Sequence, residues 1–328
     1  MKRFLVIGGA GYVGSHLVAL LLDRGAAVTV LDRLSTGHRA AVPPGAAFVR
    51  ADIADTSAVD AVLAAGPWEA VFHFAAQSLV GESMRDPLRY LGENAGDGIR
   101  LIQSCVRHGI GRFVLSSTAA VFGEPDRVPI PEDAPFAPTS PYGESKLMLE
   151  RALHWADRAH GLRSAVLRYF NAAGADPAGR LGEDHDPETH LIPLAIDAAL
   201  GRRPPLTLFG TDYDTPDGTC IRDYVHVSDL ADAHLRALDR LGRSSVTYNL
   251  GSGAGHSVRE VIGCVGEVLG HPVPVSESAR RAGDPARLVA SSDRIKRETG
   301  WSPRFTHLED LVRTAAAWRR DHPGGYAQ

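Results

Sequence analysis

The sequence has few cysteines and no long hydrophobic run. Its 328 residues include three cysteines, Cys105, Cys220 and Cys264. They are odd in number and widely spaced, so we expect reduced thiols in a cytoplasmic protein and no disulfide framework. No stretch approaches the ~20 apolar residues of a membrane span. The chain runs from Met1 straight into an apolar segment, so we expect neither a signal peptide nor a membrane partner.

Charge of one sign and metal-binding motifs are also lacking. The formal net charge is −4, which argues against a dedicated nucleic-acid binder. The sequence contains no H-E-x-x-H or C-x-x-C motif, so we expect no metal site. Hydrophobic residues make up 44% of the chain, enough for a sizeable core, and the length suits one large or two smaller domains.

The first half of the chain alternates apolar runs with helical patterns. Six apolar runs predict strands, at Phe4–Ile7, Ala27–Leu31, Ala46–Arg50, Ala70–Phe74, Phe113–Ser116 and Ser164–Arg168. Most are separated by predicted helices, at Ser15–Arg24, Ser57–Ala65, Gly92–His108 and Ser145–His160. This order predicts an α/β fold, a doubly wound parallel sheet of Rossmann-like type with its ligand at the carboxyl ends of the strands.

The second half changes character after residue 172. Residues 173–220 are rich in Gly, Pro and Asp, and a strand and a helix follow at Asp223–Val227 and Ser228–Arg240. We predict a larger lobe, residues 1–172 with 221–253, and a smaller α/β substrate lobe, residues 173–220 with 254–328. The smaller lobe includes expected helices at Pro193–Leu200, Val258–Leu269 and Leu308–Arg320.

A glycine-rich loop follows the first strand. Gly8, Gly11 and Gly14 give the spacing G-x-x-G-x-x-G between a strand and a helix. The first permits a tight turn, the second lets the backbone approach a pyrophosphate, and the third allows close packing of helix on strand. The second strand ends at Asp32, whose carboxylate suits an adenosine ribose and repels a 2′-phosphate. This predicts NAD rather than NADP, although Arg33 beside it weakens the choice.

Tyr142 and Lys146 lie four residues apart in SPYGESKLMLE, on one face of a predicted helix. A lysine cation close to a tyrosine lowers the pKa of the phenol, which can then serve as a general base or acid toward an alcohol. The pair alone is also typical of a solvated helix face. Its place behind a dinucleotide-binding loop favours the catalytic interpretation.

Eight segments occur in order along nearly the whole chain: GGAGYVGSH, LDRLSTG, HFAAQSLVGES, LSSTAAVFG, SPYGESKLMLE, LRYFNAAGA, LFGTDYDTPDGTCIRDYVHVSDLADAH and YNLGSG. Together they resemble the UDP-glucose 4-epimerases of the extended short-chain dehydrogenase/reductase family. The resemblance implies a tightly held NAD, a UDP-hexose substrate and a homodimer.

The resemblance also implies residue roles. Tyr142 is the expected base for the sugar 4-hydroxyl, Lys146 assists it and binds the nicotinamide ribose, and Thr118 hydrogen-bonds the same hydroxyl. Beside Tyr142 and Lys146, the expected NAD contacts are Gly8, Gly11, Tyr12, Val13, Gly14, Asp32, Arg33, Leu34, Ser35, Thr36, Gly37, Asp52, Ile53, Phe74, Ala75, Ala76, Ser78, Asn94 and Phe170. Beside Thr118, the expected substrate contacts are Asn171, His190, Leu191, Thr207, Phe209, Arg222, Tyr224, Arg281, Asp284 and Leu288.

Two positions depart from the family pattern, and a third is expected to affect which sugars are accepted. Ser78 replaces a lysine that reaches the cofactor in some members, Phe122 replaces a common tyrosine, and Leu288 occupies the position that limits sugar size. His185, like His190, is interpreted as a loop residue near the sugar. The implied reaction is oxidation at C4, rotation of the 4-keto sugar and return of the hydride, with UDP anchored throughout.

Other functions remain open at this stage. The protein can also be a 4-epimerase for UDP-N-acetylhexosamines or UDP-pentoses, because the sequence does not settle which sugar is accepted. A nucleotide-sugar 4,6-dehydratase shares the fold, but in it the threonine is followed by Asp-Glu, and here Ala119 and Ala120 follow Thr118. An ordinary dehydrogenase with exchangeable NAD, or a non-catalytic NAD-sensing module, accounts for the glycine loop but not for the whole series.

Overall fold

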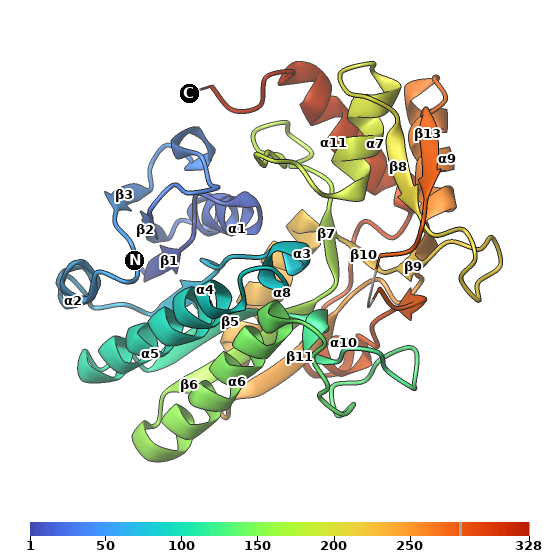
Figure 1. The fold of residues 1–328 in the computed structure, drawn as a ribbon. Helices are drawn as coiled ribbons and strands as arrows, with labels where there is room; N and C mark the ends of the chain where they lie inside the picture. The colour runs from blue at the N-terminus through green and yellow to red at the C-terminus, as the bar shows by residue number, and fades with distance from the viewer. Residues whose placement is uncertain (282–283, 328) are drawn as a thin grey trace.

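The computed structural model describes residues 1–281 and 284–327. A seven-stranded sheet forms the centre of the larger lobe, in the order β11-β6-β5-β4-β1-β2-β3 (Figure 1). Every neighbouring pair is parallel. The strands are β1 Arg3–Ile7, β2 Ala27–Asp32, β3 Ala47–Arg50, β4 Ala70–His73, β5 Arg112–Thr118, β6 Arg163–Tyr169 and β11 Val246–Leu250. The predicted doubly wound α/β fold is confirmed.

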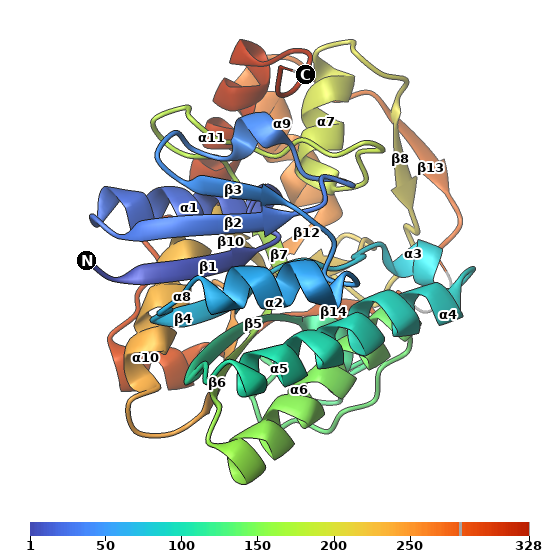
Figure 2. The ribbon, with the colours of Figure 1, turned by 90° about the vertical axis from the view of Figure 1, so that its left-hand side faces the viewer.

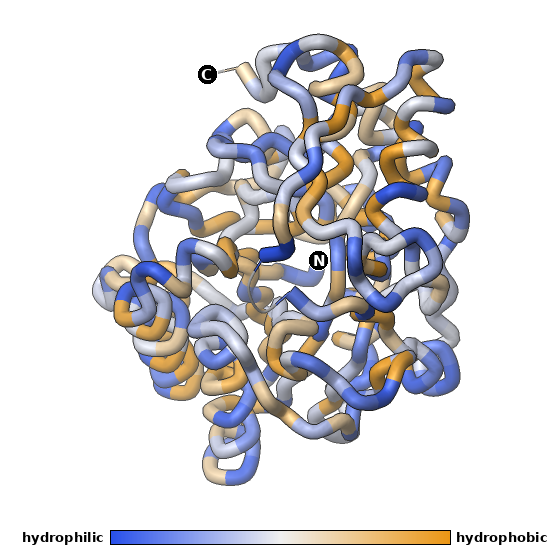
Figure 3. The backbone as a smooth tube through the Cα atoms, turned by 45° about the vertical axis from the view of Figure 1, so that its right-hand side comes forward, coloured by the Kyte–Doolittle hydropathy of each residue, from blue (hydrophilic) through white to orange (hydrophobic). Residues whose placement is uncertain are grey.

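Helices cover both faces of this sheet (Figure 2). One face carries α1 Tyr12–Asp23, α8 Val227–Arg240 and α10 Asp293–Thr299; the other carries α2 Thr56–Ala64, α5 Gly98–Arg107 and α6 Pro141–His160. Alternate residues of β1 enter the two cores: Phe4 and Val6 pack in the first, Leu5 and Ile7 in the second. Burial on both faces explains why the strands read as unbroken apolar runs. Outer helices carry hydrophobic and hydrophilic stretches side by side (Figure 3).

The strand order reverses between β1 and β4. The chain builds β1, β2 and β3 outward on one side, then crosses to β4, β5, β6 and β11 on the other. Loops that leave the carboxyl ends of β1 and β4 therefore diverge and open a crevice, where ligands of such folds bind.

The predicted helix Gly92–His108 is divided. It corresponds to a π-helical segment, Leu91–Asp97, followed by α5. Two short helices, α3 Val80–Ser83 and α4 Pro87–Tyr90, precede it, and Asp86 caps α4 through the backbone N–H of Arg89. Hydrophobic periodicity gave no sign of the π-helical turns, which are often found at functional sites.

The smaller lobe surrounds a third core (Figure 1). Its helices are α7 Leu191–Ala199, α9 Val258–Leu269 and α11 Leu308–Asp321, and its outer strands β8 Leu206–Phe209 and β13 Val275–Ser278 pair in parallel. Two small sheets link the lobes: β7 Asn171–Ala173 with β10 Tyr224–His226, and β9 Ile221–Arg222 between β12 His256–Ser257 and β14 Arg287–Leu288. Single turns of 3₁₀-helix lie at Arg39–Ala41 and Ala119–Val121.

The chain returns to the larger lobe near residue 293. Ile295 and Trp301, which the predicted boundary assigned to the smaller lobe, pack in the core beneath the sheet, and the Trp301 indole donates to the Asp229 carbonyl over 3.1 Å. This stretch of the predicted smaller lobe therefore supports the sheet, and the division of the chain into two lobes stays a prediction. Within the described ranges, no helix combines the length and apolar character needed to cross a membrane.

Candidate active site

The glycine loop after β1 has the geometry that its spacing predicts. Gly8 has a φ of 79°, and a Cβ there would lie 2.4 Å from the backbone nitrogen of Ala75. A Cβ at Gly14 would lie 2.3 Å from the Gly8 carbonyl oxygen, so α1 packs closely on the loop. At Gly11 the nearest atom would be 3.5 Å away, which leaves space outside the turn. The first turn of α1 holds no acidic residue and suits an anionic group.

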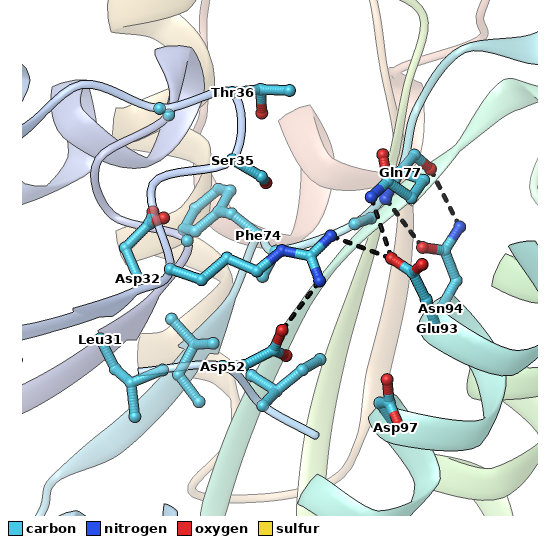
Figure 4. Close-up of a pocket in the computed structure, with 18 of the residues that line it drawn as sticks. Leu31, Asp32, Ser35, Thr36, Asp52, Phe74, Gln77, Glu93, Asn94 and Asp97 are labelled. Atoms are coloured by element: carbon cyan, nitrogen blue, oxygen red, sulfur yellow. Dashed lines mark hydrogen bonds and ion pairs between the residues drawn. The ribbon is translucent and has the colours of Figure 1, made fainter. Parts of the chain in front are cut away.

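A pocket opens at the carboxyl ends of β1, β2 and β4 (Figure 4). Thirteen of the predicted NAD contacts line it: Gly8, Gly11, Asp32, Arg33, Ser35, Thr36, Gly37, Asp52, Ile53, Phe74, Ala75, Ala76 and Asn94. Six further lining residues were not predicted: Ile7, Leu31, Ala51, Gln77, Glu93 and Asp97. All but Asp97 are direct neighbours of predicted residues in the sequence, which was the signal available.

Several predicted NAD contacts do not line this pocket. The Tyr12 hydroxyl donates to the Gly174 carbonyl over 2.6 Å, so its side chain is directed toward the segment that follows β7. Val13, Leu34 and Phe170 pack against hydrophobic clusters. Gly14, Ser78, Tyr142 and Lys146 are likewise outside the lining, and direct cofactor contact by these eight residues stays a prediction.

Asp32 is fixed by the loops around it. One carboxylate oxygen accepts from the Ala10 N–H over 3.0 Å and the other from the Leu34 N–H over 2.8 Å. Leu34 adopts a φ of 62°, unusual for a non-glycine residue. The Asp32 carboxylate therefore ties the glycine loop to the loop after β2 and presents its charge to the pocket.

Arg33 is held by two carboxylates. Its guanidinium donates to Asp52 over 2.8 Å and to Glu93 over 2.9 Å, and both acids point to the same part of the pocket in Figure 4. Burial alone lowers the pKa of Arg33, but these two hydrogen bonds outweigh it and raise the pKa. The arginine that weakened the choice of NAD is thus already paired, and a 2′-phosphate here would meet Asp32, Asp52 and Glu93.

Asn94 connects the pocket to the helix that carries Tyr142. Its side-chain oxygen accepts from the Gln77 N–H over 2.8 Å, and its amide nitrogen donates to the Gln77 carbonyl and to the Ser145 hydroxyl. Asn94 lies in the π-helical segment and is buried. The irregular turns therefore place an amide between two parts of the predicted site.

Thr118 lies at the end of β5 and Tyr142 at the start of α6. Ser140 caps α6, its hydroxyl accepting from the Gly143 N–H over 3.2 Å, and Pro141 occupies the first turn. Burial raises the pKa of Tyr142, and its interaction with the Thr118 hydroxyl partly offsets that rise. The structure therefore brings the predicted base and its hydroxyl partner together.

Lys146 lies deeper than expected. It is 2% exposed, and its ammonium donates to the Ser116 carbonyl over 2.9 Å. Burial lowers the pKa of Lys146 to about 8, against the opposing effect of Glu150. The expected lowering of the Tyr142 pKa by Lys146 is not what the structure shows, because burial dominates the environment of the phenol.

The lowered pKa of Lys146 predicts a pH-dependent stability. Because its folded pKa of about 8 lies below its ordinary value of 10.5, the unfolded chain binds more protons between these limits. The cost of burying the charge is fully present below pH 8 and is relieved as pH rises, by at most ~1.4 kcal/mol per unit.

Between pH 8 and 10.5, the unfolding free energy of the unmodified chain gains a contribution from Lys146 that Lys146→Met lacks. The unfolding free energy of Lys146→Met should therefore rise less with pH, or fall more steeply, than that of the unmodified chain. Urea unfolding at one fixed NAD concentration measures it. Parallel curves for the two proteins would contradict the assignment.

The predicted substrate residues gather at the junction of the lobes. Arg222 forms an ion pair with Asp284, and in the small sheet its β9 position pairs with Leu288 of β14. The Arg281 guanidinium lies 4.1 Å from the centre of the Phe209 ring. Thr207 lies on β8 with Phe209, Asn171 and Tyr224 pair as neighbours on β7 and β10, and Leu191 begins α7.

His190 has a different partner from the one expected. Its Nδ1 lies 2.6 Å from a carboxylate oxygen of Glu183, within a cluster that also contains His185 and Glu188. Its contact with the sugar nucleotide stays a prediction. The cluster itself was missed, although its residues share the segment GEDHDPETH.

Comparisons with known proteins agree with this geometry. Residues 4–251 match the model of the NAD dependent epimerase/dehydratase family. The chain is 52% identical to a UDP-glucose 4-epimerase of Azospirillum brasilense over 97% of this chain and 92% of the relative. The fold matches a UDP-glucose 4-epimerase from Brucella ovis in complex with NAD, with a TM-score of 0.94, 45% identity and coverage of 97% and 98% of the two chains. It also matches the enzyme from Bifidobacterium longum in complex with NAD+ and UDP, with a TM-score of 0.94, 33% identity and coverage of 99% and 100%.

The family match extends over the glycine loop, the NAD-type pocket and the Thr118–Tyr142–Lys146 group, and the full-length matches include the smaller lobe as well. The chain belongs to the NAD dependent epimerase/dehydratase family, and over its whole length it is similar to the UDP-glucose 4-epimerases.

Proposed function

We propose that the protein interconverts UDP-glucose and UDP-galactose with NAD as its resident cofactor. The observation that carries this proposal is that three features occur together in this chain, which is similar to the UDP-glucose 4-epimerases over its whole length. These are a pocket that suits NAD, a partly buried Tyr142 that interacts with Thr118, and two arginines at the junction of the lobes.

The pocket residues fit NAD. Gly11 leaves space beside the amides of α1 for a diphosphate, and Asp32 offers a carboxylate to a ribose. The paired Arg33 and the acidic lining disfavour a 2′-phosphate. NAD held by these residues would supply a reversible hydride acceptor for C4 of the sugar and would not be consumed.

Tyr142 and Thr118 handle the proton of the sugar 4-hydroxyl. In this proposal the Tyr142 phenol, as phenolate, takes that proton and later returns it, and Thr118 hydrogen-bonds the same oxygen. Because burial raises the pKa of Tyr142, ionisation needs a compensating positive charge. The ammonium of Lys146, buried beneath the same helix, is the cation available for it.

Binding energy on the nucleotide half leaves the hexose free to turn. Arginine pairs bidentately with phosphate oxygens, and Arg222 and Arg281 lie on segments that meet at the lobe junction. In this proposal they hold UDP between the larger lobe, 1–172 with 221–253, and the smaller lobe, 173–220 with 254–328. Weak contacts to the sugar then permit rotation of the keto form.

Dehydration fits the site less well. Elimination across C5 and C6 requires an acid and a base, and the residues that follow Thr118 are Ala119 and Ala120. The Ala120 N–H instead donates to the Thr118 hydroxyl over 3.1 Å. Relatives that act on other UDP-sugars share the whole framework, so substrate size is tested separately.

The decisive experiment omits added cofactor. We expect the purified protein, incubated with UDP-galactose alone, to form UDP-glucose until both are present at equilibrium, and to retain activity after extensive dialysis. Chromatography of the sugar nucleotides measures it. Strict dependence on fresh NAD with steady formation of its reduced form would assign a dehydrogenase, and a 4-keto-6-deoxy product would assign a dehydratase.

We also propose a homodimer that acts in the cytoplasm. Trp155 on α6 is 62% exposed and Met148 lies on the same helix, which supports a second copy as the cover for this apolar surface. The three cysteines are free thiols, as suits a reducing compartment. Light scattering of the purified protein tests the dimer.

A further inference from the structure

Four side chains that the proposed reaction does not use as acids or bases converge outside the NAD pocket. Glu183, His185, Glu188 and His190 belong to the segment between β7 and α7, and their ligand-type atoms all lie within 4.8 Å of one another. The spacing is E-x-H-x-x-E-x-H, which differs from the metal motifs sought in the sequence. The next residue, Leu191, begins α7.

The cluster is closed in by two other elements. The Tyr12 ring of α1 meets the His185 ring edge-on at 6.2 Å between centroids. On the other side, α11 places Trp318 where a Cβ on Gly182 would lie 2.1 Å from the indole, and Arg319 donates to the Glu183 carbonyl over 3.2 Å. The segment is therefore held firmly in the position that brings the four side chains together.

Three buried atoms of the cluster have no hydrogen bond of standard geometry, although ion-pair contacts join them. They are Glu183 Oε1, His185 Nδ1 and Glu188 Oε2, and Glu183 is only 6% exposed. The other oxygen of Glu188 accepts from the Thr189 and His190 N–H groups over 2.8 and 2.9 Å, which fixes its carboxylate. Buried polar atoms without aligned partners cost free energy, so a ligand that satisfies these three atoms would stabilise the segment.

The carboxylate oxygens and imidazole nitrogens of the cluster lie close together, but their angles do not meet the requirements of a hydrogen bond. Glu183 Oε1 lies 2.6 Å from His190 Nδ1 and 3.4 Å from His185 Nδ1, and Glu188 Oε2 lies 3.8 Å from His185 Nδ1. In a tetrahedral zinc site with bonds near 2.0–2.2 Å, ligand atoms lie ~3.3 Å apart. The observed separations scatter around that value, and the half-exposed His190 leaves room for a side-chain rotation that completes the shell.

Charge also suits a dication. Two carboxylates face two imidazoles, and the nearest other cation, Arg319, lies 4.0 Å from Glu188 and is already paired with Asp197. One divalent cation balances the charge of the two carboxylates.

We propose that Glu183, His185, Glu188 and His190 bind one divalent transition-metal ion of the zinc type. Two imidazole nitrogens and two carboxylate oxygens suit Zn²⁺ and exclude a preference for Mg²⁺ or Ca²⁺, which take oxygen ligands. Four protein ligands make the site structural rather than catalytic. It fixes the entry to α7, and the inference does not depend on the proposed reaction.

Metal binding to the full-length chain, without a histidine tag, tests the site. After treatment with a chelator and dialysis against ZnCl₂, elemental analysis should find one zinc per chain, and the melting temperature should rise with zinc concentration. Glu183→Gln and His185→Asn should weaken zinc binding at least about tenfold, since even changes outside the ligand shell cost that much. His108→Asn is the matched control, because His108 pairs with Asp60 on the surface at 3.2 Å.

Cobalt gives a second measurement that needs no variant. Co²⁺ bound by the intact chain in four-coordinate geometry should give visible absorption bands that zinc abolishes, with release of protons into the solution. The proposal is overturned if no zinc binds stoichiometrically, if Glu183→Gln binds as tightly as His108→Asn, or if Mg²⁺ binds in preference. A cluster held together by its ion pairs alone would show none of the expected results.

Discussion

Replacing Tyr142 with phenylalanine should lower the turnover of UDP-galactose by about 10²–10⁴-fold, the usual contribution of a general acid–base group. The substitution keeps the ring and removes only the hydroxyl that interacts with Thr118. The NAD pocket is lined by other residues, so the variant should purify with as much NAD as the unmodified chain. Initial rates with saturating UDP-galactose, normalised to bound NAD, give the comparison.

Tyr248→Phe is the matched control for this experiment. The Tyr248 hydroxyl donates to Glu298 of α10 over 2.8 Å, beneath the sheet, and its ring is fully buried. Its loss should cost stability of the order of one hydrogen bond, about 1 kcal/mol, and leave turnover nearly unchanged. Near-normal turnover in Tyr142→Phe would show that another group takes the proton.

The sheet and its ligand edge could be predicted because their signals are local. Each central strand is buried on both faces and reads as an apolar run, and the glycines at 8, 11 and 14 follow the first run directly. The small strands β9, β12 and β14 could not be predicted, because each has only two residues and so shows no periodicity. The division of the predicted helix 92–108 was missed because π-helical turns leave no hydrophobic pattern.

Side-chain pairing between distant segments accounts for the rest. In the sequence, Arg33 weakened the prediction of NAD over NADP, because nothing nearby shows that its charge is paired. Its partners, Asp52 and Glu93, lie 19 and 60 residues away. The spacing of Lys146 and Tyr142 predicted that their side chains lie side by side. In the structure the Lys146 ammonium is buried under α6, where it donates to a carbonyl of β5. The histidine–glutamate cluster lies in one short segment, yet only the packing of α1 and α11 around it brings its four side chains together.

Leu288→Tyr should suppress turnover of UDP-N-acetylhexosamines relative to plain UDP-hexoses, by about ten- to two-hundredfold. Leu288 packs with Phe170 against the cluster of Phe122 and Ile130, and its strand pairs with that of Arg222. A larger ring here fills the space that a 2-acetamido group needs, and overlap of a methylene or two costs on the order of 1–3 kcal/mol. Leu288→Gly should shift the ratio of the two activities the other way.

Arg287→Tyr supplies the matched control for substrate size. Adjacent residues of a strand point to opposite faces, and Arg287 is exposed, so a ring there should leave the sugar unaffected. The unmodified chain should prefer the plain hexoses and turn over the N-acetyl forms slowly, because leucine is intermediate in size and can change rotamer. Rates with UDP-galactose and UDP-N-acetylgalactosamine, measured side by side for the three variants, give the ratios. If both Leu288 variants had the same ratio of the two rates as Arg287→Tyr, Leu288 would not set the size limit. The sugar would then lie against another surface.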